Sequence, residues 1–434
     1  CTLGPSSRDE ETMEAMLMAG MNVARLNFSH GTHEDHKKTI ESFRRVRDKL
    51  DLPAAVLLDT KGPEIRLKDF ENGSEIIEDG QVFTLTSEDI QGTKERVATT
   101  YAALPSQVEK GTKILIDDGR IRLEVSETTD TDVICKVVSG GKVSNRKGVN
   151  IPNKSLDLEY ISEADRNDIL FGIKMDVDYV AASFVRKGDD VRQLRTLLNE
   201  NGGDKIKIIS KIENMEGIEN FREILDLSDG IMVARGDMGV EVDFEKLPGL
   251  QKKFIKECCK AGKPVITATQ MLESMISNPR PTRAEASDVA NAIYDGTTAI
   301  MLSGESAAGQ YPVEAVKTMA ALAERTEQEI DYPSRMRRYE KECIKNCEIG
   351  ITQSISSAVC SIAMEIGAAA IMPVTLSGQT ACQVSRYKPV CPIIGCTIKA
   401  RVCRQMAMYW GVSSLLIAEA EDSEELFDIA VETL

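Results

Sequence analysis

The sequence has no excess of positive charge, no long apolar run and no regular cysteine framework. Its 434 residues carry a formal net charge of -16 and a pI near 4.9, which argues against nucleic acid or an anionic membrane as the main partner. No stretch approaches the roughly 20 apolar residues of a membrane span. The 11 cysteines are scattered without a paired spacing, as in proteins of a reducing compartment. We therefore predict a cytoplasmic protein that acts on small molecules.

The chain does contain one repeated unit, in which a short apolar run is followed by a polar loop and a segment of helical period. The runs cover residues 21–29, 54–60, 178–184, 205–213, 230–237, 264–271 and 299–305, with residues 1–4 as the stub of an earlier one. Eight such β/α units predict a closed parallel (β/α)8 TIM barrel, in which the chemistry gathers at the carboxyl ends of the strands.

Two segments depart from this repeat. Residues 67–149 show alternating apolar and polar positions with Asp-Gly and Gly-Gly turns, which predicts an inserted β-barrel domain that acts as a lid on a barrel made of residues 1–66 and 150–331. Residues 332–434 return to a βα pattern, with apolar runs at 368–375, 391–398 and 413–420, and are predicted to form a third, regulatory α/β domain. The chain opens without Met and ends abruptly, so we expect residues to be missing at both ends.

Charged residues lie where the apolar runs end. Because side chains alternate along a strand, Lys211 and Glu213 share one face, while Ile208, Ser210 and Ile212 occupy the other. Each unpaired ion in an enclosed interior costs several kcal/mol of desolvation, which a metal ion and an anionic substrate would offset. This pattern predicts the floor of an active site.

The same alternation places Arg25, Asn27 and Ser29 on one face of an earlier run. A guanidinium holds phosphate bidentately, and the oxygens of Asn and Ser suit a hard cation. The next run ends in residues 59–66, which bring two carboxylates and two cations to the same edge. A ring of surface ion pairs is the alternative interpretation of that segment.

Several strings resemble those of pyruvate kinases in order and spacing. They are NFSHG at 27–31, DTKGPEIR at 59–66, KIEN at 211–214, VARGD at 233–237, ATQMLESM at 268–275, PRPTRAE at 279–285 and MLSGE at 301–305. The resemblance implies transfer of the phosphoryl group of phosphoenolpyruvate to ADP, followed by protonation of enolpyruvate to pyruvate. It is close over the barrel and the inserted segment and looser over the last hundred residues.

Carried over by position, the resemblance implies a role for each rim residue. Glu213 and Asp237 hold Mg²⁺ or Mn²⁺, Lys211 faces the transferring phosphoryl group, and Arg25 grips the phosphate. The backbone amides of Gly236 and Asp237 receive the substrate carboxylate. Thr269 lies near the carbon that gains a proton, through a relay that includes water. Ser303 and Glu305 either feed this relay or are structural.

The resemblance also implies a K⁺ site and a nucleotide site. The K⁺ ligands are the oxygens of Asn27, Ser29, Asp59 and Thr60. Glu64 supports K⁺ dependence, because relatives that need no K⁺ carry Lys at this position. The nucleotide contacts are Arg66 and Lys147 for the phosphates and Pro5 and His30 for the adenine side. No P-loop motif occurs in the sequence.

Residues Ser377, Gly378, Gln379 and Thr380 form a hydroxyl-rich loop between a strand and a helix, and the matching loop of the family binds a phosphorylated allosteric effector. A plain helix cap is the alternative. The family also implies a homotetramer with contacts through the barrel and the C-terminal domain.

Two other function classes compete with this interpretation. One is a Mg²⁺-dependent lyase or aldolase of enolpyruvate-type substrates on the same barrel. The other is a metabolite sensor without catalysis, against which the presence of Lys211, Glu213 and Asp237 argues. The chain's only histidines, His30, His33 and His36, invite a zinc hypothesis, but no nearby cysteine completes a tetrahedral set.

Overall fold

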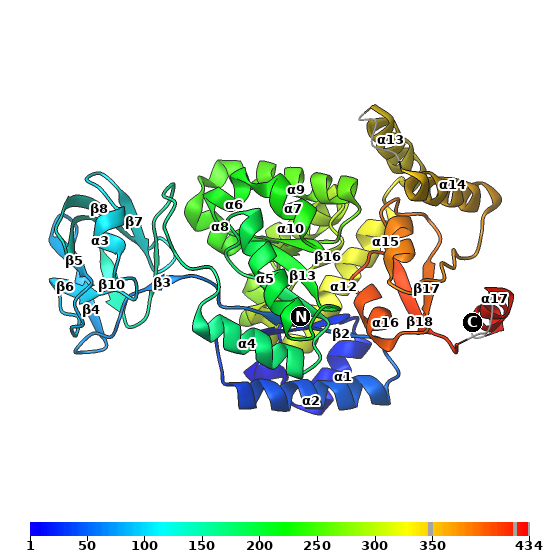
Figure 1. Cartoon of the computed structure of the whole chain (residues 1–434), viewed down its shortest axis with the longest axis horizontal. Coiled ribbons are helices and arrows are strands. Elements are labelled where there is room, and N and C mark those ends of the chain that lie inside the picture. The colour runs from blue at the N-terminus through cyan, green and yellow to red at the C-terminus, as the bar shows by residue number, and fades with distance from the viewer. Residues whose placement is uncertain (346–349, 420–422, 433–434) are drawn as a thin grey trace.

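The structure is a computed structural model that describes residues 1–345, 350–419 and 423–432. Its central part is a curled parallel sheet surrounded by helices, with a β-rich part on one side and a smaller α/β part on the other (Figure 1). Among the described residues, no helix is both long and apolar enough to cross a membrane.

The central sheet has the strand order β1-β2-β12-β13-β14-β15-β16. These strands are β1 (Val23–Asn27), β2 (Ala55–Asp59), β12 (Tyr179–Ala182), β13 (Lys207–Ile212), β14 (Gly230–Ala234), β15 (Val265–Ala268) and β16 (Ala299–Ile300). Thr2 closes the circle, because it bridges in parallel to Arg25 and its amide donates to Leu302 O at 3.0 Å. The predicted parallel barrel is therefore confirmed. The predicted runs are longer than the strands because they include the polar loops at the strand ends.

Helices cover the outside of this barrel. They are α1 (Glu10–Met18), α2 (His33–Lys49), α4 (Glu163–Lys174), α5 (Gly188–Glu200), α6 (Met215–Glu219), α7 (Phe221–Leu227), α8 (Arg235–Glu241), α9 (Leu247–Ala261), α10 (Arg283–Asp295), α11 (Gly304–Ala307) and α12 (Pro312–Gln328), with short 3-10 turns η1 (Pro5–Ser7), η2 (Phe244–Lys246) and η3 (Glu273–Ile276). The sequence marks their ends: Thr32 and Thr282 form capping boxes at the starts of α2 and α10.

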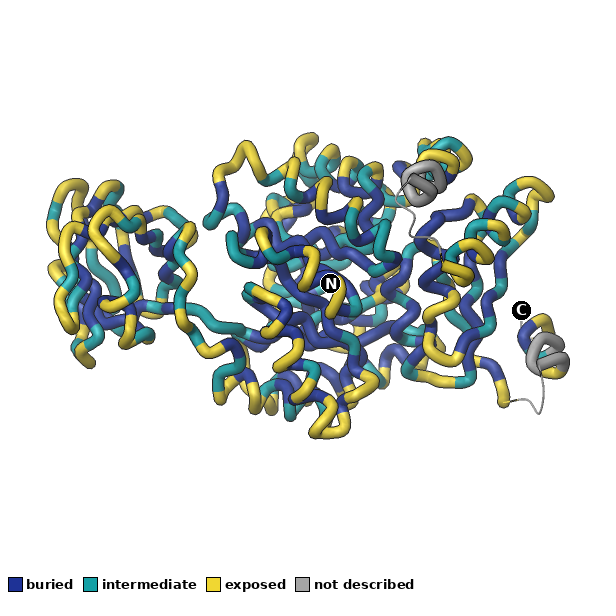
Figure 2. The backbone as a smooth tube through the Cα atoms, turned by 45° about the horizontal axis from the view of Figure 1, so that its top comes forward, coloured by how far each residue is buried: buried dark blue, intermediate teal, exposed yellow. Residues whose placement is uncertain are grey.

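Alternating side chains of each strand serve two different cores. On β13, Ile208 and Ile212 pack outward among the helices, whereas Ile209 points inward with Tyr179 and Met232. Strands that are buried on both faces explain the near-continuous apolar runs in the sequence. Figure 2 shows this buried centre in dark blue.

Residues between β2 and α4 form a separate β structure. Its strands are β3 (Ile65–Arg66), β4 (Ser74–Ile77), β5 (Val82–Thr86), β6 (Arg96–Ala98), β7 (Lys113–Ile116), β8 (Ile121–Thr128), β9 (Asp132–Ser139), β10 (Gly141–Ser144) and β11 (Gly148–Asn150), with the short helix α3 (Leu104–Gln107). One sheet has the order β3-β11-β7-β8-β9-β5-β6, and β10 pairs with β4. The apolar residues of this part pack with one another as a core distinct from that of the barrel. Two segments of the chain, one around β3 and one after β11, connect this part to the rim of the barrel (Figure 1).

The C-terminal part contains α13 (Tyr332–Lys345), α14 (Ile351–Ile366), α15 (Gln379–Ser385), β17 (Ile393–Thr397), α16 (Ala400–Met406), β18 (Val412–Leu416) and α17 (Ser423–Glu432). Of the three apolar runs, the first does not form a full strand. Ile371 and Val374 make isolated parallel bridges to β17, since Pro373 between them has no N–H to donate to the ladder. The expectation of a strand over 368–375 is corrected in this respect.

This C-terminal part seals the amino end of the barrel. Inward residues of the barrel strands share one apolar cluster with Ala381, Val402 and Met406. Polar contacts frame the cluster: Tyr179 donates to Gln405 O at 2.5 Å, and Lys388 Nζ donates to the carbonyls of Gly296 and Thr297 at 2.6 and 3.1 Å. The carboxyl end of the barrel is thus the open one.

Candidate active site

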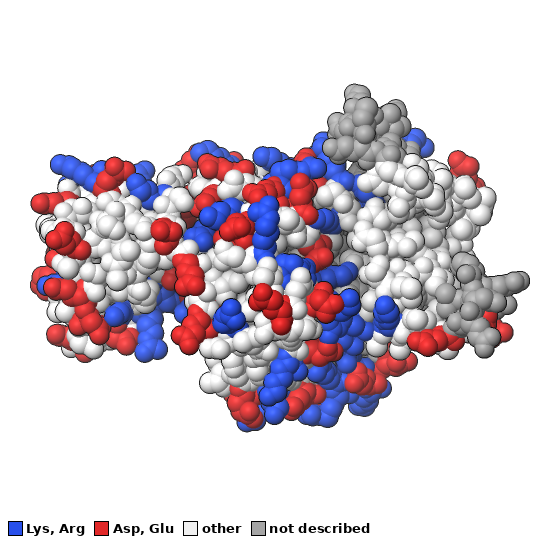
Figure 3. All heavy atoms as spheres, viewed as in Figure 1, with Lys and Arg blue, Asp and Glu red and all other residues white. Residues whose placement is uncertain are grey.

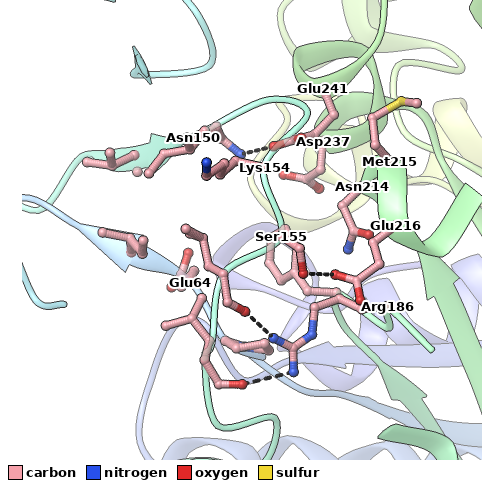
Figure 4. A pocket seen from close by; sticks show the side chains of 18 of the residues that line it. Glu64, Asn150, Lys154, Ser155, Arg186, Asn214, Met215, Glu216, Asp237 and Glu241 are labelled. Carbon is pink, nitrogen blue, oxygen red and sulfur yellow. Dashed lines mark hydrogen bonds between the residues drawn. The ribbon is translucent and has the colours of Figure 1, made fainter. Parts of the chain in front are cut away.

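A cavity of about 560 Å³ lies between the carboxyl rim of the barrel and the inserted β part. Glu64, Arg186 and Asp237 line it from the barrel side, and Lys147 and Asn150 from the β part. Figure 4 shows Asn150 and Glu241 meeting across this cavity, where Asn150 Nδ2 donates to Glu241 Oε1 at 3.2 Å. The cavity therefore changes shape if the two parts move apart.

The buried amine of Lys211 lies at the inner wall of this rim, at the end of β13. Its Nζ is 3.1 Å from Asp59 Oδ1 and 2.9 Å from Glu213 Oε1, and it donates to Ser183 Oγ at 2.7 Å. These partners follow three neighbouring strands, β2, β12 and β13. The sequence-based pairing of Lys211 with Glu213 is found in the structure.

Burial and ion pairing act in opposite directions on the Lys211 pKa. Burial lowers the pKa of this amine, but the carboxylates of Asp59 and Glu213 outweigh it and raise the pKa well above its ordinary value. Lys211 is therefore a fixed positive charge at any pH at which the protein works, which suits electrostatic stabilisation and not proton transfer.

Asp59 links this amine to the guanidinium of Arg25. Arg25 Nε lies 2.5 Å from Asp59 Oδ2, and its Nη1 donates to Thr2 Oγ1 at 2.8 Å. Burial raises the Asp59 pKa, but the charges of Arg25 and Lys211 bring it below its ordinary value. Asp59 therefore holds both cations in place, and Glu213 is the second carboxylate beside Lys211.

Glu213 and Asp237 are the carboxylates available for a divalent ion. Glu213 Oε2 accepts the Phe184 amide at 2.6 Å, whereas Oε1 is buried and, among the described residues, has no hydrogen-bond donor beyond its ion pair with Lys211. Burial together with the nearby Asp237 carboxylate raises the pKa of Glu213 to about 7 despite Lys211. An under-satisfied buried carboxylate oxygen beside a second carboxylate fits a Mg²⁺ site.

Within the described ranges, no three His, Cys, Asp or Glu side chains converge as a metal site. Mg²⁺ is commonly held by one or two carboxylates together with oxygens of a phosphorylated substrate, so the Glu213 and Asp237 pair remains a sufficient protein contribution.

Thr269 follows β15 and faces the start of α8. Its Oγ1 donates to Ala268 O at 2.6 Å and accepts the Gly236 amide at 2.8 Å. The Gly236 amide, which we expected to receive the substrate carboxylate, is thus already paired with this hydroxyl. A bound carboxylate has to share or replace that contact.

Glu305 is buried behind this corner. Its two carboxylate oxygens accept the amides of Leu272 and Ser303 at 3.0 and 2.7 Å. Both oxygens hold loop backbone, and this geometry favours the structural alternative for Glu305 and Ser303.

The residues predicted as K⁺ ligands come from neighbouring strand ends, since Asn27 and Asp59 are register partners in the β1–β2 pair. Asn27 Oδ1 accepts the Ser29 amide at 3.1 Å, and the Thr60 hydroxyl donates to Ala181 O at 3.3 Å. The four residues predicted to supply oxygen ligands for K⁺ therefore follow or end two neighbouring strands, β1 and β2.

The residues predicted to contact nucleotide fall into two groups. Arg66 and Lys147 line the cavity, with Arg66 paired to Glu64 at 2.7 Å and Lys147 to Asp117 at 2.7 Å. Pro5 and His30 are exposed and do not line it. Glu64 also lies 3.4 Å from Lys61 Nζ, so its carboxylate is surrounded by cations.

Sequence reasoning missed three polar residues of this site. Ser183 bridges Lys211 and Asp59, donating to Asp59 Oδ1 at 3.1 Å; the alternation Tyr179, Ala181, Ser183 would have placed it inward. The contact between Asn150 and Glu241 joins segments 91 residues apart, and no local pattern marks it.

The residues predicted to bind an effector span the start of α15: Ser377 and the N-cap Gly378 precede the helix, and Gln379 and Thr380 are its first two residues. The Gly378 amide donates to Thr375 Oγ1 at 3.0 Å, and the Gln379 amide lies 3.4 Å from Ser377 Oγ. The hydroxyls therefore hold the loop itself in this structure.

A closed parallel barrel is an enzyme fold whose active site lies at the carboxyl rim, and the cations and carboxylates gathered there are typical of enzymes that act on anionic substrates. Comparison with known proteins specifies the family. Residues 1–316 match the family model "Pyruvate kinase, barrel domain", and residues 353–434 match "Pyruvate kinase, alpha/beta domain". The chain belongs to the pyruvate kinase family.

Individual relatives agree with this assignment. The chain is 48% identical over 434 residues to a pyruvate kinase of Geobacillus stearothermophilus, covering 100% of this chain and 73% of that protein. It is 48% identical over 432 residues to a pyruvate kinase of Clostridium acetobutylicum, covering 99% and 90%. A crystal structure of a pyruvate kinase from Cryptosporidium parvum superposes with a TM-score of 0.95 at 40% identity, covering 100% of this chain and 89% of that one.

Proposed function

We propose that this protein transfers the phosphoryl group of phosphoenolpyruvate to ADP, giving ATP and pyruvate. The observation that carries the proposal is the buried cluster of Lys211, Asp59, Glu213 and Arg25 at the barrel rim, in a chain that is 48% identical to a pyruvate kinase over its full length.

The chain's own residues account for the transfer step. The bond between phosphorus and the enol oxygen breaks, and a bond to a terminal oxygen of ADP forms. Lys211, permanently charged, stabilises the negative charge on the phosphoryl oxygens, and Arg25, held by Asp59, orients the same group. Both cations are fixed by ion pairs before substrate arrives, so little reorganisation is needed.

Glu213 and Asp237 would hold a divalent cation, Mg²⁺ or Mn²⁺. When bound, this ion neutralises charge on the phosphoryl group and on the enolate oxygen. The K⁺ would be held by oxygens of Asn27, Ser29, Asp59 and Thr60. Glu64 supports K⁺ dependence, since its carboxylate supplies no substitute cation at that position.

Enolpyruvate then gains a proton at its methylene carbon. Thr269 Oγ1, which accepts the Gly236 amide, would lie beside the substrate carboxylate. Because a Thr hydroxyl is a weak acid, the proton comes from solvent through an ordered water, with Thr269 as the last group of the relay.

Nucleotide phosphates would contact Arg66 and Lys147, and Lys147 would approach them when the inserted β part closes on the rim. Pro5 and His30 would contact the adenine side only if the base extends past the cavity lining. The alternative lyase or aldolase function has no comparable support from relatives.

Regulation and assembly belong to the C-terminal part. Ser377, Gly378, Gln379 and Thr380 would bind a phosphorylated effector through hydroxyls and amides. A homotetramer is supported by α14, on which Ile351, Ile355, Ile362 and Ile366 are exposed along one face. An exposed apolar face of this kind can pack against the same face of a second copy, as in a two-fold contact. Figure 3 shows few charges around α14 and α15 on the visible face.

The test is a coupled assay for ATP from phosphoenolpyruvate and ADP with Mg²⁺, first with K⁺ and then with a large inert cation in its place. We expect ATP formation in K⁺ and a large loss without it. Absence of ATP formation under both conditions refutes the proposed reaction, and undiminished activity without K⁺ refutes the K⁺ site alone.

A further inference from the structure

Two successive residues after β15 have left-handed backbone conformations. Thr269 has φ 68° and Gln270 has φ 54°. For residues with a Cβ this conformation costs about 1–2 kcal/mol each, and for a β-branched residue such as Thr it is a true outlier. Such a turn persists only where surrounding groups hold it, and these turns are common at functional sites.

The guanidinium of Arg235, the first residue of α8, is the group that holds this turn. Its Nη2 donates to Thr269 O at 2.6 Å and its Nε donates to Ala268 O at 3.2 Å. Both acceptors are backbone carbonyls of the turn itself. The Arg235 side chain is 9% exposed, so these charge-assisted bonds form in a place where water does not compete for the donors.

A third contact fixes the plane of the guanidinium. Arg235 Nη1 is 2.6 Å from Oδ2 of Asp288 in α10, and the Asp288 side chain is 36% exposed. The flat fork of Arg thereby reaches an acid on one side and two carbonyls on the other. A lysine ammonium carries the same charge but cannot span these acceptors with the same geometry.

We propose that Arg235 is a positioning residue for the proton-delivery step: it clamps the left-handed turn at Thr269 and Gln270, so that Thr269 Oγ1 stays where it accepts the Gly236 amide and donates to Ala268 O. This rests on the proposed function, in which Thr269 ends the proton relay. Arg235 acts through Thr269, and its own donors are occupied by the two backbone carbonyls, Asp288, Gln251 Oε1 at 3.4 Å and Met271 Sδ at 2.8 Å.

The first test is Arg235→Lys in the full-length protein, with two activities measured separately. One is ATP formation from phosphoenolpyruvate and ADP. The other is exchange of the methyl protons of pyruvate for deuterium in D₂O with Mg²⁺ and K⁺, followed by NMR, which reports the proton step alone. We expect exchange to fall on the order of 10–100-fold, with a smaller change in the KM for phosphoenolpyruvate. Arg222→Lys is the matched control, because Arg222 forms an exposed pair with Glu257 away from the turn, and it should leave both activities unchanged.

The second test is rescue by glycine at the strained position. Gln270 is exposed, and Gly adopts the left-handed region at no steric cost. Gln270→Gly alone should stay near the parent activity, and Arg235→Lys with Gln270→Gly should recover at least part of the lost exchange. A double variant as impaired as Arg235→Lys would overturn the proposal, since the turn would not be what Arg235 holds.

If Arg235→Lys does not fold, Asp288→Asn carries the same test, because it keeps the guanidinium and weakens only its orientation. Its expected loss in exchange is smaller and should again be reduced by Gln270→Gly; equal exchange in Asp288→Asn and the parent would contradict the clamp. A failure of the clamp can be told apart from a failure of the proposed reaction. A parent protein that makes no ATP refutes the reaction, whereas a parent that makes ATP and an Arg235→Lys variant with full exchange refute the clamp alone.

Discussion

Strand β13 carries two lysines on the same inward face, and they lie at opposite ends of the barrel. Lys211 is at the carboxyl rim, where Asp59 and Glu213 outweigh its burial and raise its pKa. Lys207 is at the amino end, where burial lowers its pKa because Cys382 and Asp229 compensate too little. Lys207 Nζ bonds to the hydroxyl of Tyr409 from the C-terminal part. The same residue type on the same strand is therefore a fixed charge at the open end and a packing contact at the sealed end.

This difference shows that the two ends of the barrel have different roles. The rim gathers buried ions that pair with one another, whereas the amino end is closed by apolar side chains and by an amine bound to backbone carbonyls. Changes at the first end should affect turnover, and changes at the second should affect stability.

The largest effect is expected from replacing Lys211. Lys211→Met should lower ATP formation by at least about 10²–10³-fold, because the transferring phosphoryl group loses its fixed positive charge. Lys207→Met is the matched control on the same face of the strand and should keep activity within a few-fold. Comparable losses in both variants, measured in the coupled assay after a check of folding, would remove the distinction between the two ends.

A smaller effect is expected at the carboxylate beside Lys211. Glu213→Gln should lower the affinity for Mg²⁺ by about 10–100-fold, since a neutral amide is a poorer ligand for a hard cation. Glu219→Gln changes an exposed acid that lines the rim cavity; it controls for general electrostatics and should bind Mg²⁺ as the parent does. Titration of activity with Mg²⁺ measures both; equal Mg²⁺ dependence in all three proteins would argue against Glu213 as a ligand.

At the amino end, the prediction concerns stability and its pH dependence. Burial lowers the pKa of Lys388 from 10.5 to about 8, so between about pH 8 and 10.5 the unfolded chain binds a proton that the folded protein has released. Stability from this group therefore rises with pH in that window. Lys388→Met should lose this rise and, with two carbonyls left unpaired, about 1–3 kcal/mol of stability at neutral pH. Urea unfolding of both proteins from pH 7 to 10 checks this; a constant difference would contradict the assigned pKa.

The smallest effect is expected at the contact between the inserted β part and the rim. Asn150→Ala removes one hydrogen bond to Glu241, worth about 1 kcal/mol, and should raise the KM for ADP by roughly 5-fold through a less closed cavity, with kcat little changed. The double variant with Glu241→Ala should lose less than the sum of the two single losses, because each single change already removes the shared contact; full additivity in this double-mutant cycle would mean that the two residues do not interact.

The sequence was sufficient for the barrel because buried parallel strands leave continuous apolar runs, and strand alternation placed Lys211 beside Glu213. It was not sufficient where a contact depends on distant segments. Ser183 between Lys211 and Asp59, and Arg235 across the turn at Thr269, are defined by neighbouring strand ends and not by their own sequence context. Pro373 shows the opposite case, in which a local signal that interrupts a strand was present but was outweighed by the apolar run around it.

The central claim is that Glu213 and Asp237 together hold a divalent ion next to Lys211. An anomalous difference map from crystals grown with Mn²⁺ and phosphoenolpyruvate tests it most directly. We expect a peak within about 2.0–2.2 Å of an oxygen of each carboxylate, with the substrate phosphate between the ion and Lys211. A fully occupied Mn²⁺ peak elsewhere on the rim, in a protein that forms ATP, would contradict it.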